Sequence, residues 1–210
     1  MAQCDCKAFH SHRRVVLTGG PGAGKTAVLE LVRRFFCRHV KVLPESATIL
    51  FSGGFPRGGS EAARMAAQRA IFRVQLELEQ LAAAEDDTAI VLCDRGTLDG
   101  MAYWPRESGE ELLDAMGSSR GQQLARYDAV IHMRTPELTG YNHSNPLRLE
   151  SLAEAHAIDQ RIAQAWSGHP QRHFVPSTSD FLDKARHAIH HIREQLPECC
   201  RRCTPPIDLG

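Results

Sequence analysis

The stretch Gly19-Gly20-Pro21-Gly22-Ala23-Gly24-Lys25-Thr26 decides the fold of this 210-residue chain. It matches G-x-x-x-x-G-K-[ST], the Walker A pattern of a P-loop, whose backbone N–H groups wrap around phosphate. A β-branched run at residues 14–18 precedes it, and residues 26–38 follow with apolar side chains at helical spacing. Because a strand before and a helix after are the context that the pattern requires, we predict that these eight residues bind a nucleoside triphosphate.

Two residues at the end of this loop have separate expected roles. A helix that starts near Lys25 directs free backbone N–H groups and the positive end of its dipole at an anion. The Lys25 ammonium is expected to reach the β- and γ-phosphates, and the Thr26 hydroxyl to bind Mg²⁺. The chain has no [NT]KxD segment of the guanine-recognition type. ATP and Mg²⁺ are therefore the predicted cofactors.

The rest of the chain alternates short apolar runs with longer segments of helical spacing. The predicted strands are residues 14–18, 40–43, 89–93, 129–133 and 173–175. The predicted helices are residues 26–38, 60–84, 110–126, 147–166 and about 180–196, with Ser60 as one N-cap and Ser179 or Asp180 as another. This alternation favours an α/β fold of the P-loop NTPase type, a three-layer α/β/α sandwich with a five-stranded parallel sheet. Ligands of such sheets bind at the carboxyl ends of the strands.

Acidic and basic residues follow two of these predicted strands. Asp94 closes the apolar run 89–93 and is a candidate ligand of Mg²⁺, although it is also a plausible helix cap. Arg95 comes next and is a candidate for contact with the transferred phosphoryl group, unless it is a surface arginine. Glu45 follows the second strand and is the candidate general base for an acceptor hydroxyl, with a turn residue as the alternative.

Two further segments supply weaker candidates. Residues 135–146 form a predicted polar loop that Arg134 and Arg148 flank. This loop is a candidate lid over a triphosphate, and Arg148 is a candidate catalytic residue; the alternative is that these arginines are only solvated. On the helix 60–84, a polar and aromatic face is a candidate grip for a planar acceptor, although such faces are more often packing and solvated polar residues. The candidate acceptor-binding residues are Glu45, Arg69, Phe72 and Gln75, with Gln68 on the same helix face as the last two.

Composition limits the function classes. Lys and Arg total 25 and Asp and Glu total 25, so a zero net charge argues against a stable nucleic-acid partner. No apolar run is long enough to span a membrane, and the amino terminus has no apolar core of a secretory signal, which predicts a cytoplasmic protein. We expect one domain over residues 13–196, flanked by polar tails at 1–12 and 197–210.

The seven cysteines are unevenly placed. Cys37 and Cys93 lie in apolar segments and are interpreted as small core residues. The other five form a C-x-C pair near the amino terminus and a C-C-x-x-C group near the carboxyl terminus, at Cys4, Cys6, Cys199, Cys200 and Cys203. If the termini meet, these groups could bind zinc; the alternative is free thiols in a reducing compartment.

The order of these motifs resembles that of the small-molecule P-loop kinases, above all the nucleoside-kinase and ribosylnicotinamide-kinase-like branch. The shared features are an acid after the second strand, a Gln-bearing helix, an acid-Arg-small triplet and an Arg-bearing lid. In this sequence they stand at Glu45, Gln68, Asp94-Arg95-Gly96, Arg134 and Arg148. Gly96 departs from the Ser that nucleoside kinases usually carry, which weakens any inference of nucleoside specificity.

Over residues 13–195 the chain is more similar to a compact family of predicted ATPases classed as an AAA-type domain. The matching segments are residues 68–79 (QRAIFRVQLELE), 94–103 (DRGTLDGMAY), 145–150 (NPLRLE), 165–170 (AWSGHP) and 180–184 (DFLDK). There is no separate helical lid domain after the core, which disfavours a ring-forming motor.

Together these resemblances imply a Mg-ATP-dependent phosphotransferase that acts on a small hydroxylated metabolite such as a nucleoside or ribosyl compound. Lys25 and Arg95 would neutralise charge, Thr26 and Asp94 would organise Mg²⁺, and Glu45 would act as base. The alternative is an ATPase or ATP-dependent switch that regulates a partner protein. A homodimer is compatible with the sequence.

Overall fold

The computed structural model describes residues 4, 6, 7, 10–84, 88–136, 151–178 and 180–204. Five parallel strands form one sheet in the order β2-β3-β1-β4-β5. They are β1 (Arg13–Thr18), β2 (Val40–Leu43), β3 (Ile90–Asp94), β4 (Ala129–Met133) and β5 (Arg172–Val175). The predicted α/β fold with a five-stranded parallel sheet is confirmed, and each predicted strand lies within about a residue of its observed position.

The central strands β3 and β4 are apolar at all but one position each, and β1 is apolar at Val15, Val16 and Leu17, because both faces of the sheet are covered. In β1, Val15 and Leu17 point into one core and Val16 into the other, as a period of two residues requires. Val91 of β3 and Val130 of β4 share the second core with Val16. An unbroken apolar run is the pattern expected of a parallel strand between two helical layers.

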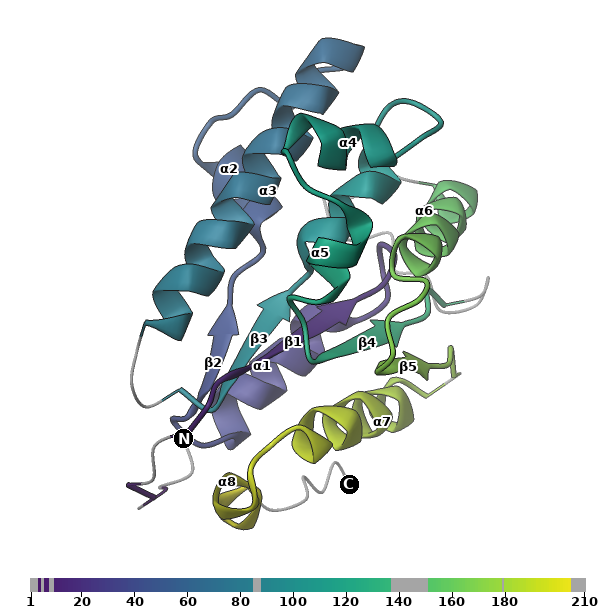
Figure 1. Cartoon of the computed structure of the whole chain (residues 1–210). Coiled ribbons are helices and arrows are strands. Elements are labelled where there is room, and N and C mark those ends of the chain that lie inside the picture. Colours follow the sequence, from purple (N-terminus) through teal and green to yellow (C-terminus); the bar gives the residue numbers. More distant parts are fainter. Residues whose placement is uncertain are drawn as a thin grey trace.

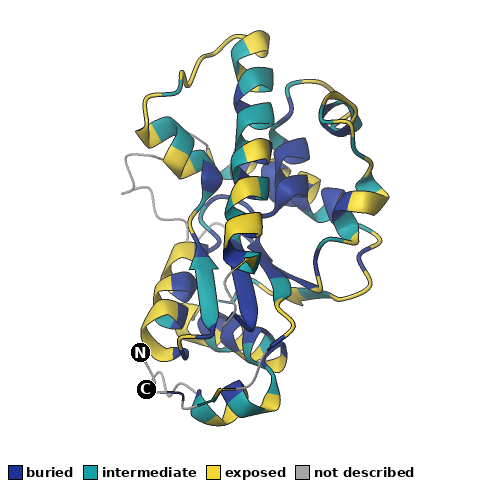
Figure 2. Ribbon diagram, turned by 60° about the vertical axis from the view of Figure 1, so that its left-hand side comes forward, coloured by how far each residue is buried: buried dark blue, intermediate teal, exposed yellow. Residues whose placement is uncertain are grey.

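Helices cover both faces of the sheet (Figure 1). On one face lie α1 (Lys25–Phe35) and α7 (Phe181–Glu194), and α8 (Glu198–Cys203) extends that core. On the other face lie α3 (Glu61–Ala83), the 3₁₀ helix η1 (Thr97–Tyr103), α4 (Glu110–Ala115), α5 (Arg120–Leu124) and α6 (Leu152–Ala165). Figure 2 shows buried central strands between helices whose outer surfaces are exposed. In the described part of the chain, no helix has both the length and the apolar character needed to cross a membrane.

Several helix boundaries were predicted correctly because capping residues marked them. The Ser60 hydroxyl accepts a hydrogen bond from the Ala63 N–H at the start of α3, and the Asp180 carboxylate accepts one from the Leu182 N–H at the start of α7. The predicted start of a helix at residue 147 falls outside the described residues. Within the described part, α6 begins at Leu152, after Ser151 and Glu154 form a reciprocal capping box.

Three other segments differ from the prediction. Residues 46–52 form a helix, α2 (Ser46–Ser52), that was not predicted. Seven residues are too few for apolar side chains to show a helical period. The predicted helix 110–126 is two short helices, α4 and α5, because Gly117 interrupts it. Residues 198–203 form α8, where a polar tail was expected, and Cys200 of this helix is fully buried against the core.

Candidate functional site

The glycine-rich loop follows β1 and lies against the end of β4. Gly19 has a φ of +136°, and a Cβ atom there would lie 2.0 Å from the carbonyl oxygen of Met133. No side chain fits at that distance, so the close approach of two strand ends requires glycine. The Lys25 ammonium donates hydrogen bonds to the carbonyl oxygens of Gly19 (2.8 Å) and Gly20 (3.0 Å), so the lysine side chain folds back along the loop.

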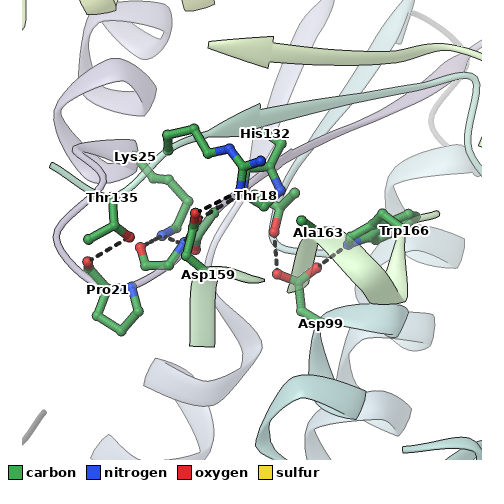
Figure 3. A network of polar contacts seen from close by, with 12 residues as sticks. Thr18, Pro21, Lys25, Asp99, His132, Thr135, Asp159, Ala163 and Trp166 are labelled. Atoms are coloured by element: carbon green, nitrogen blue, oxygen red, sulfur yellow. Dashed lines mark hydrogen bonds and ion pairs between the residues drawn. The ribbon is translucent and has the colours of Figure 1, made fainter. Parts of the chain in front are cut away.

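A carboxylate on α6 anchors the base of this loop. Asp159 accepts a hydrogen bond from the Gly20 N–H at 2.9 Å and makes another with His132 Nε2 at 2.8 Å, and it forms an ion pair with Arg134 at 3.1 Å (Figure 3). Burial opposes its ionisation, but the hydrogen bond and charge of His132 and the donors on Gly20 and Arg134 lower the pKa of Asp159 to about 2. The sequence did not single out Asp159, because its partners lie on distant segments.

Four charged side chains interact near the ends of β2 and β3, namely those of Lys25, Glu45, Asp94 and Arg95. Arg95 Nε donates to Glu45 Oε1 at 2.7 Å, and the same guanidinium donates to the carbonyl oxygen of Gly19 at 3.2 Å. Arg95 has a φ of +72°, a left-handed conformation that non-glycine residues rarely adopt, and such strain is common at functional sites. The second and third strand ends and the phosphate-binding loop are thus joined through one arginine.

The charges of this group are shifted by burial and by one another. Burial and then the nearby Arg95 charge lower the pKa of Lys25 to about 7. Burial raises the pKa of Asp94 to about 6, against the attraction of Lys25. Burial also opposes the ionisation of Glu45, but the charge of Arg95 and hydrogen bonds from Thr48 and Arg95 lower its pKa to about 2. Perturbed ionisation of this kind is typical of functional sites.

A second buried carboxylate supports the arginine. Asp99 accepts hydrogen bonds from the Thr18 hydroxyl, from the Gly96 N–H at 3.0 Å and from the indole N–H of Trp166 at 3.0 Å, as Figure 3 shows in part. It also pairs with Arg95 at 3.4 Å. Asp99 belongs to the segment DRGTLDGMAY, whose resemblance to the AAA-type family was the signal that could have marked it, but no role was predicted for it.

Packing against Trp166 explains why residue 96 is a glycine. A Cβ atom on Gly96 would lie 2.7 Å from the Trp166 ring and 3.0 Å from Val16. Trp166 is fully buried, which places it in the core. The departure from the Ser of nucleoside kinases therefore has a steric cause within this chain.

One cavity of about 740 Å³ joins the phosphate-binding loop to a compartment between α2 and α3. This volume is in the range of sites for small molecules and cofactors. The predicted site residues that line it are Pro21, Gly22, Lys25, Thr26, Glu45, Phe72, Gln75, Asp94 and Arg95, and Gln68 lines it too. Arg57 and Arg64 also line it, and neither was predicted from the sequence.

The remaining predicted residues lie elsewhere. Arg69 and Arg134 are described but do not line the cavity, and Arg134 instead pairs with Asp159. Loop residues Gly19, Gly20, Ala23 and Gly24 shape the loop without lining the cavity. Arg148, with most of the predicted lid, lies outside the described residues.

Comparison with known families agrees with this geometry. A family model described as an AAA domain matches residues 14–181, which is most of the chain. The chain belongs to this family. No curated protein matches it.

Among solved structures, the AAA domain described here is similar to NadR protein in complex with NR, at a TM-score of 0.70 and 17% identity, over 96% of this chain and 54% of that one. It is also similar to the thymidylate kinase of Candida albicans, at a TM-score of 0.54 and 14% identity, over 88% of this chain and 93% of that one. The chain thus spans about half the length of the NadR protein. These likenesses confirm a P-loop kinase-like fold.

Proposed function

We propose that this protein binds Mg-ATP at residues 19–26 and transfers the γ-phosphoryl group to a hydroxyl of a small acceptor held between α2 and α3. The cavity carries this proposal, because it runs without interruption from Lys25 and Thr26 to Phe72 and Gln75. A simple hydrolase needs room for water beside the γ-phosphate, whereas this chain has a second compartment lined by aromatic and amide side chains. That compartment supports a phosphotransferase acting on a planar or ribosyl-like metabolite.

Gln75 is built into the acceptor compartment by a fixed network. Its amide oxygen accepts a hydrogen bond from the Ser46 hydroxyl at 2.7 Å, and its amide nitrogen donates to Glu79 at 2.9 Å. Glu79 is buried and also accepts from Tyr127. A side chain held in this way has one orientation to offer an acceptor, which supports selectivity for a hydrogen-bonding ligand.

Phosphoryl transfer to an alcohol needs few covalent participants. The acceptor oxygen forms a bond to the γ-phosphorus as the bond to the β-phosphate oxygen breaks, ADP leaves, and the hydroxyl proton passes to a carboxylate. Asp94 and Thr26 offer the hard oxygen donors that Mg²⁺ prefers, and both line the cavity. When bound, Mg²⁺ would neutralise part of the negative charge of the phosphates. The positive charges of Lys25 and Arg95 would neutralise more of it.

Glu45 is the proposed base, and its ion pair with Arg95 defines a resting state. With Arg95 beside it, the low pKa of Glu45 makes it a weak proton acceptor. If the guanidinium turns toward the γ-phosphate when ATP binds, Glu45 loses that partner and becomes more basic. The arginine would thereby couple occupancy of the nucleotide site to activation of the base.

The test is transfer of labelled phosphate. The purified chain is incubated with γ-labelled ATP and Mg²⁺, with and without pools of nucleosides and other hydroxylated metabolites. Acceptor-dependent labelling of a small molecule supports the proposal. Hydrolysis that no metabolite changes, and that a partner protein stimulates, would instead establish the ATPase or switch function.

A further inference from the structure

At the opposite end of the sheet from the cavity, cysteine and histidine side chains converge from three segments. Cys4 comes from the amino-terminal segment, Cys37 and His39 from the turn between α1 and β2, and Cys200 from α8. Their ligand atoms all lie within 4.8 Å of one another, and each residue is at most 6% exposed. In Figure 1, α8 lies at the end of the molecule where the strands begin.

The distances in this cluster fit a tetrahedral metal. In a tetrahedral zinc site, the Zn–S bond is about 2.3 Å long and the Zn–N bond is about 2.05 Å long. At a tetrahedral angle, a sulfur ligand and a nitrogen ligand of the same zinc ion are therefore about 3.6 Å apart. The separation from His39 Nδ1 is 3.5 Å to Cys200 Sγ and 3.8 Å to Cys37 Sγ. The side chains thus already stand near the corners of a zinc coordination sphere.

The backbone holds the histidine in place for this role. The carbonyl oxygen of His39 accepts hydrogen bonds from the N–H groups of Ala89 (2.8 Å) and Ile90 (3.1 Å), and the carbonyl oxygen of Cys37 accepts one from Val40 (3.0 Å). The turn is thereby fixed to the start of β3. A metal site with two ligands on such a turn requires little ordering when the metal binds.

We propose that Cys4, Cys37, His39 and Cys200 bind one structural Zn²⁺ that joins the amino-terminal segment and α8 to the sheet. Three thiolates and one imidazole are a known ligand set of closed structural zinc sites. None of the seven cysteines, all of which are described, forms a disulfide. This site is separate from the proposed phosphotransferase, since none of its ligands lines the cavity.

A second group of side chains, Cys6, His10 and Cys199, lies next to this cluster but does not form a closed zinc site of its own. Cys6 and Cys199 approach His10 Nε2 at 3.5 and 3.7 Å. Cys200 Sγ lies 3.8 Å from the same nitrogen, but it already belongs to the first cluster. Without sharing Cys200, the neighbouring group has three ligands among the described residues, where a closed structural site needs four. The His10 ring packs edge-on against His39, with ring centroids 5.3 Å apart. We therefore expect one zinc ion per chain.

Metal analysis of the full-length wild-type protein tests the site without any variant. The chain is purified under reducing conditions with zinc supplied, and zinc is measured by elemental analysis. One zinc per chain is expected, and replacement by Co²⁺ should give the intense visible bands and thiolate charge-transfer absorption of a tetrahedral site. Substoichiometric zinc with no cobalt–thiolate absorption would overturn the proposal.

Thiol alkylation of the same wild-type protein identifies the ligands. With zinc bound, Cys4, Cys37 and Cys200 should be protected, and a chelator should expose all three together while leaving Cys93 unreactive, since Cys93 is buried in the other core. Equal labelling of these thiols with and without the chelator would contradict the assignment.

Two variants and one control variant separate the four-ligand cluster from its neighbour. Cys37→Ser should lose the zinc, whereas Cys6→Ser and the matched core control Cys93→Ala should retain one zinc per chain. Retention in Cys37→Ser together with loss in Cys6→Ser would overturn the ligand assignment. If Cys37→Ser fails to fold, the alkylation pattern of the wild-type chain still decides the question.

Discussion

Glu45, Arg95 and Lys25 show how residues that are ordinary in sequence acquire unusual chemistry in this protein. Arg95 is held between Glu45 and the carbonyl oxygen of Gly19, so one guanidinium affects both a candidate base and the phosphate-binding loop. It lowers the pKa of Glu45 and contributes to the low pKa of Lys25. The function proposed for each residue therefore depends on the others.

Replacement of the proposed base should separate binding from chemistry. Glu45→Gln keeps the shape of the side chain but cannot accept the proton, so we expect transfer to fall about 10²–10⁴-fold with nearly unchanged ATP affinity. Single-turnover transfer and equilibrium nucleotide binding measure the two effects. Glu77→Gln is the control, because Glu77 is an exposed carboxylate on α3 that does not line the cavity. Unchanged turnover in Glu45→Gln would remove Glu45 from the mechanism.

Ionisation of Asp94 should lower the free energy of unfolding at neutral pH, because the pKa of this side chain in the folded protein is raised from 3.8 to about 6. The folded state then binds the proton more tightly than the unfolded state, so stability is lost as pH rises from about 4 through about 6. Asp94→Asn removes that loss, and we expect it to be more stable than wild type by about 1–3 kcal/mol at pH 8, with a smaller gain at pH 4.

Urea unfolding at the two pH values measures this difference, and phosphate transfer by the same variant should be strongly reduced because a proposed Mg²⁺ ligand is lost. An equal stability gain at both pH values would show that the effect is unrelated to the ionisation of Asp94.

At the scale of elements, two buried carboxylates position the site from α6 and η1. Asp159 on α6 holds the loop through the Gly20 N–H, and Asp99 on η1 holds Arg95 and Trp166. The helices of this face thus serve both as a cover for the sheet and as supports for the loops that follow β1 and β3.

The packing of Trp166 against residue 96 predicts the effect of restoring the kinase-like serine. Gly96→Ser places a Cβ atom 2.7 Å from the Trp166 ring, and overpacking of this kind should destabilise the protein by about 1–3 kcal/mol. Thermal or urea unfolding measures the loss.

A second substitution tests the cause of that loss. Trp166→Phe removes the ring atoms that the new side chain at position 96 would meet, so the double variant should lose less stability than the sum of the two single variants. Strict additivity would show that Trp166 is not the reason for the glycine.

At the scale of the whole molecule, the two proposed sites occupy opposite ends of one sheet. Helix α1 begins at Lys25 in the nucleotide loop and ends just before Cys37, and its eleven residues span about 16 Å. No described residue belongs to both sites. The sheet and α1 therefore separate the proposed phosphotransferase site from the proposed zinc site.

This separation predicts that nucleotide and zinc stabilise the protein independently. Ligands that bind only the folded state each raise its stability, and effects at sites without shared partners add. The rise in Tm on addition of ATP should be about the same before and after chelation of zinc, although chelation lowers Tm itself. Loss of the ATP-induced shift after chelation would reveal coupling between the two ends.

The sequence by itself determined the fold class, the nucleotide loop and the residues that follow the strands. These features are local, since glycine spacing, strand periodicity and helix caps each act over a few neighbouring residues. Lys25, Thr26, Glu45, Asp94 and Arg95 could be predicted to lie together because parallel strands end at one edge of the sheet.

Only the tertiary structure decided which distant residues meet. Asp159 reaches Gly20 from 139 residues away, Gly96 is required by Trp166, and Cys200 joins Cys4 and Cys37. Arg69 shares a helix with Gln75, yet only Gln75 lines the cavity. Contacts of this kind depend on how helices dock on the sheet, which is fixed by burial and side-chain packing across the whole chain and leaves no periodic signal in any one segment.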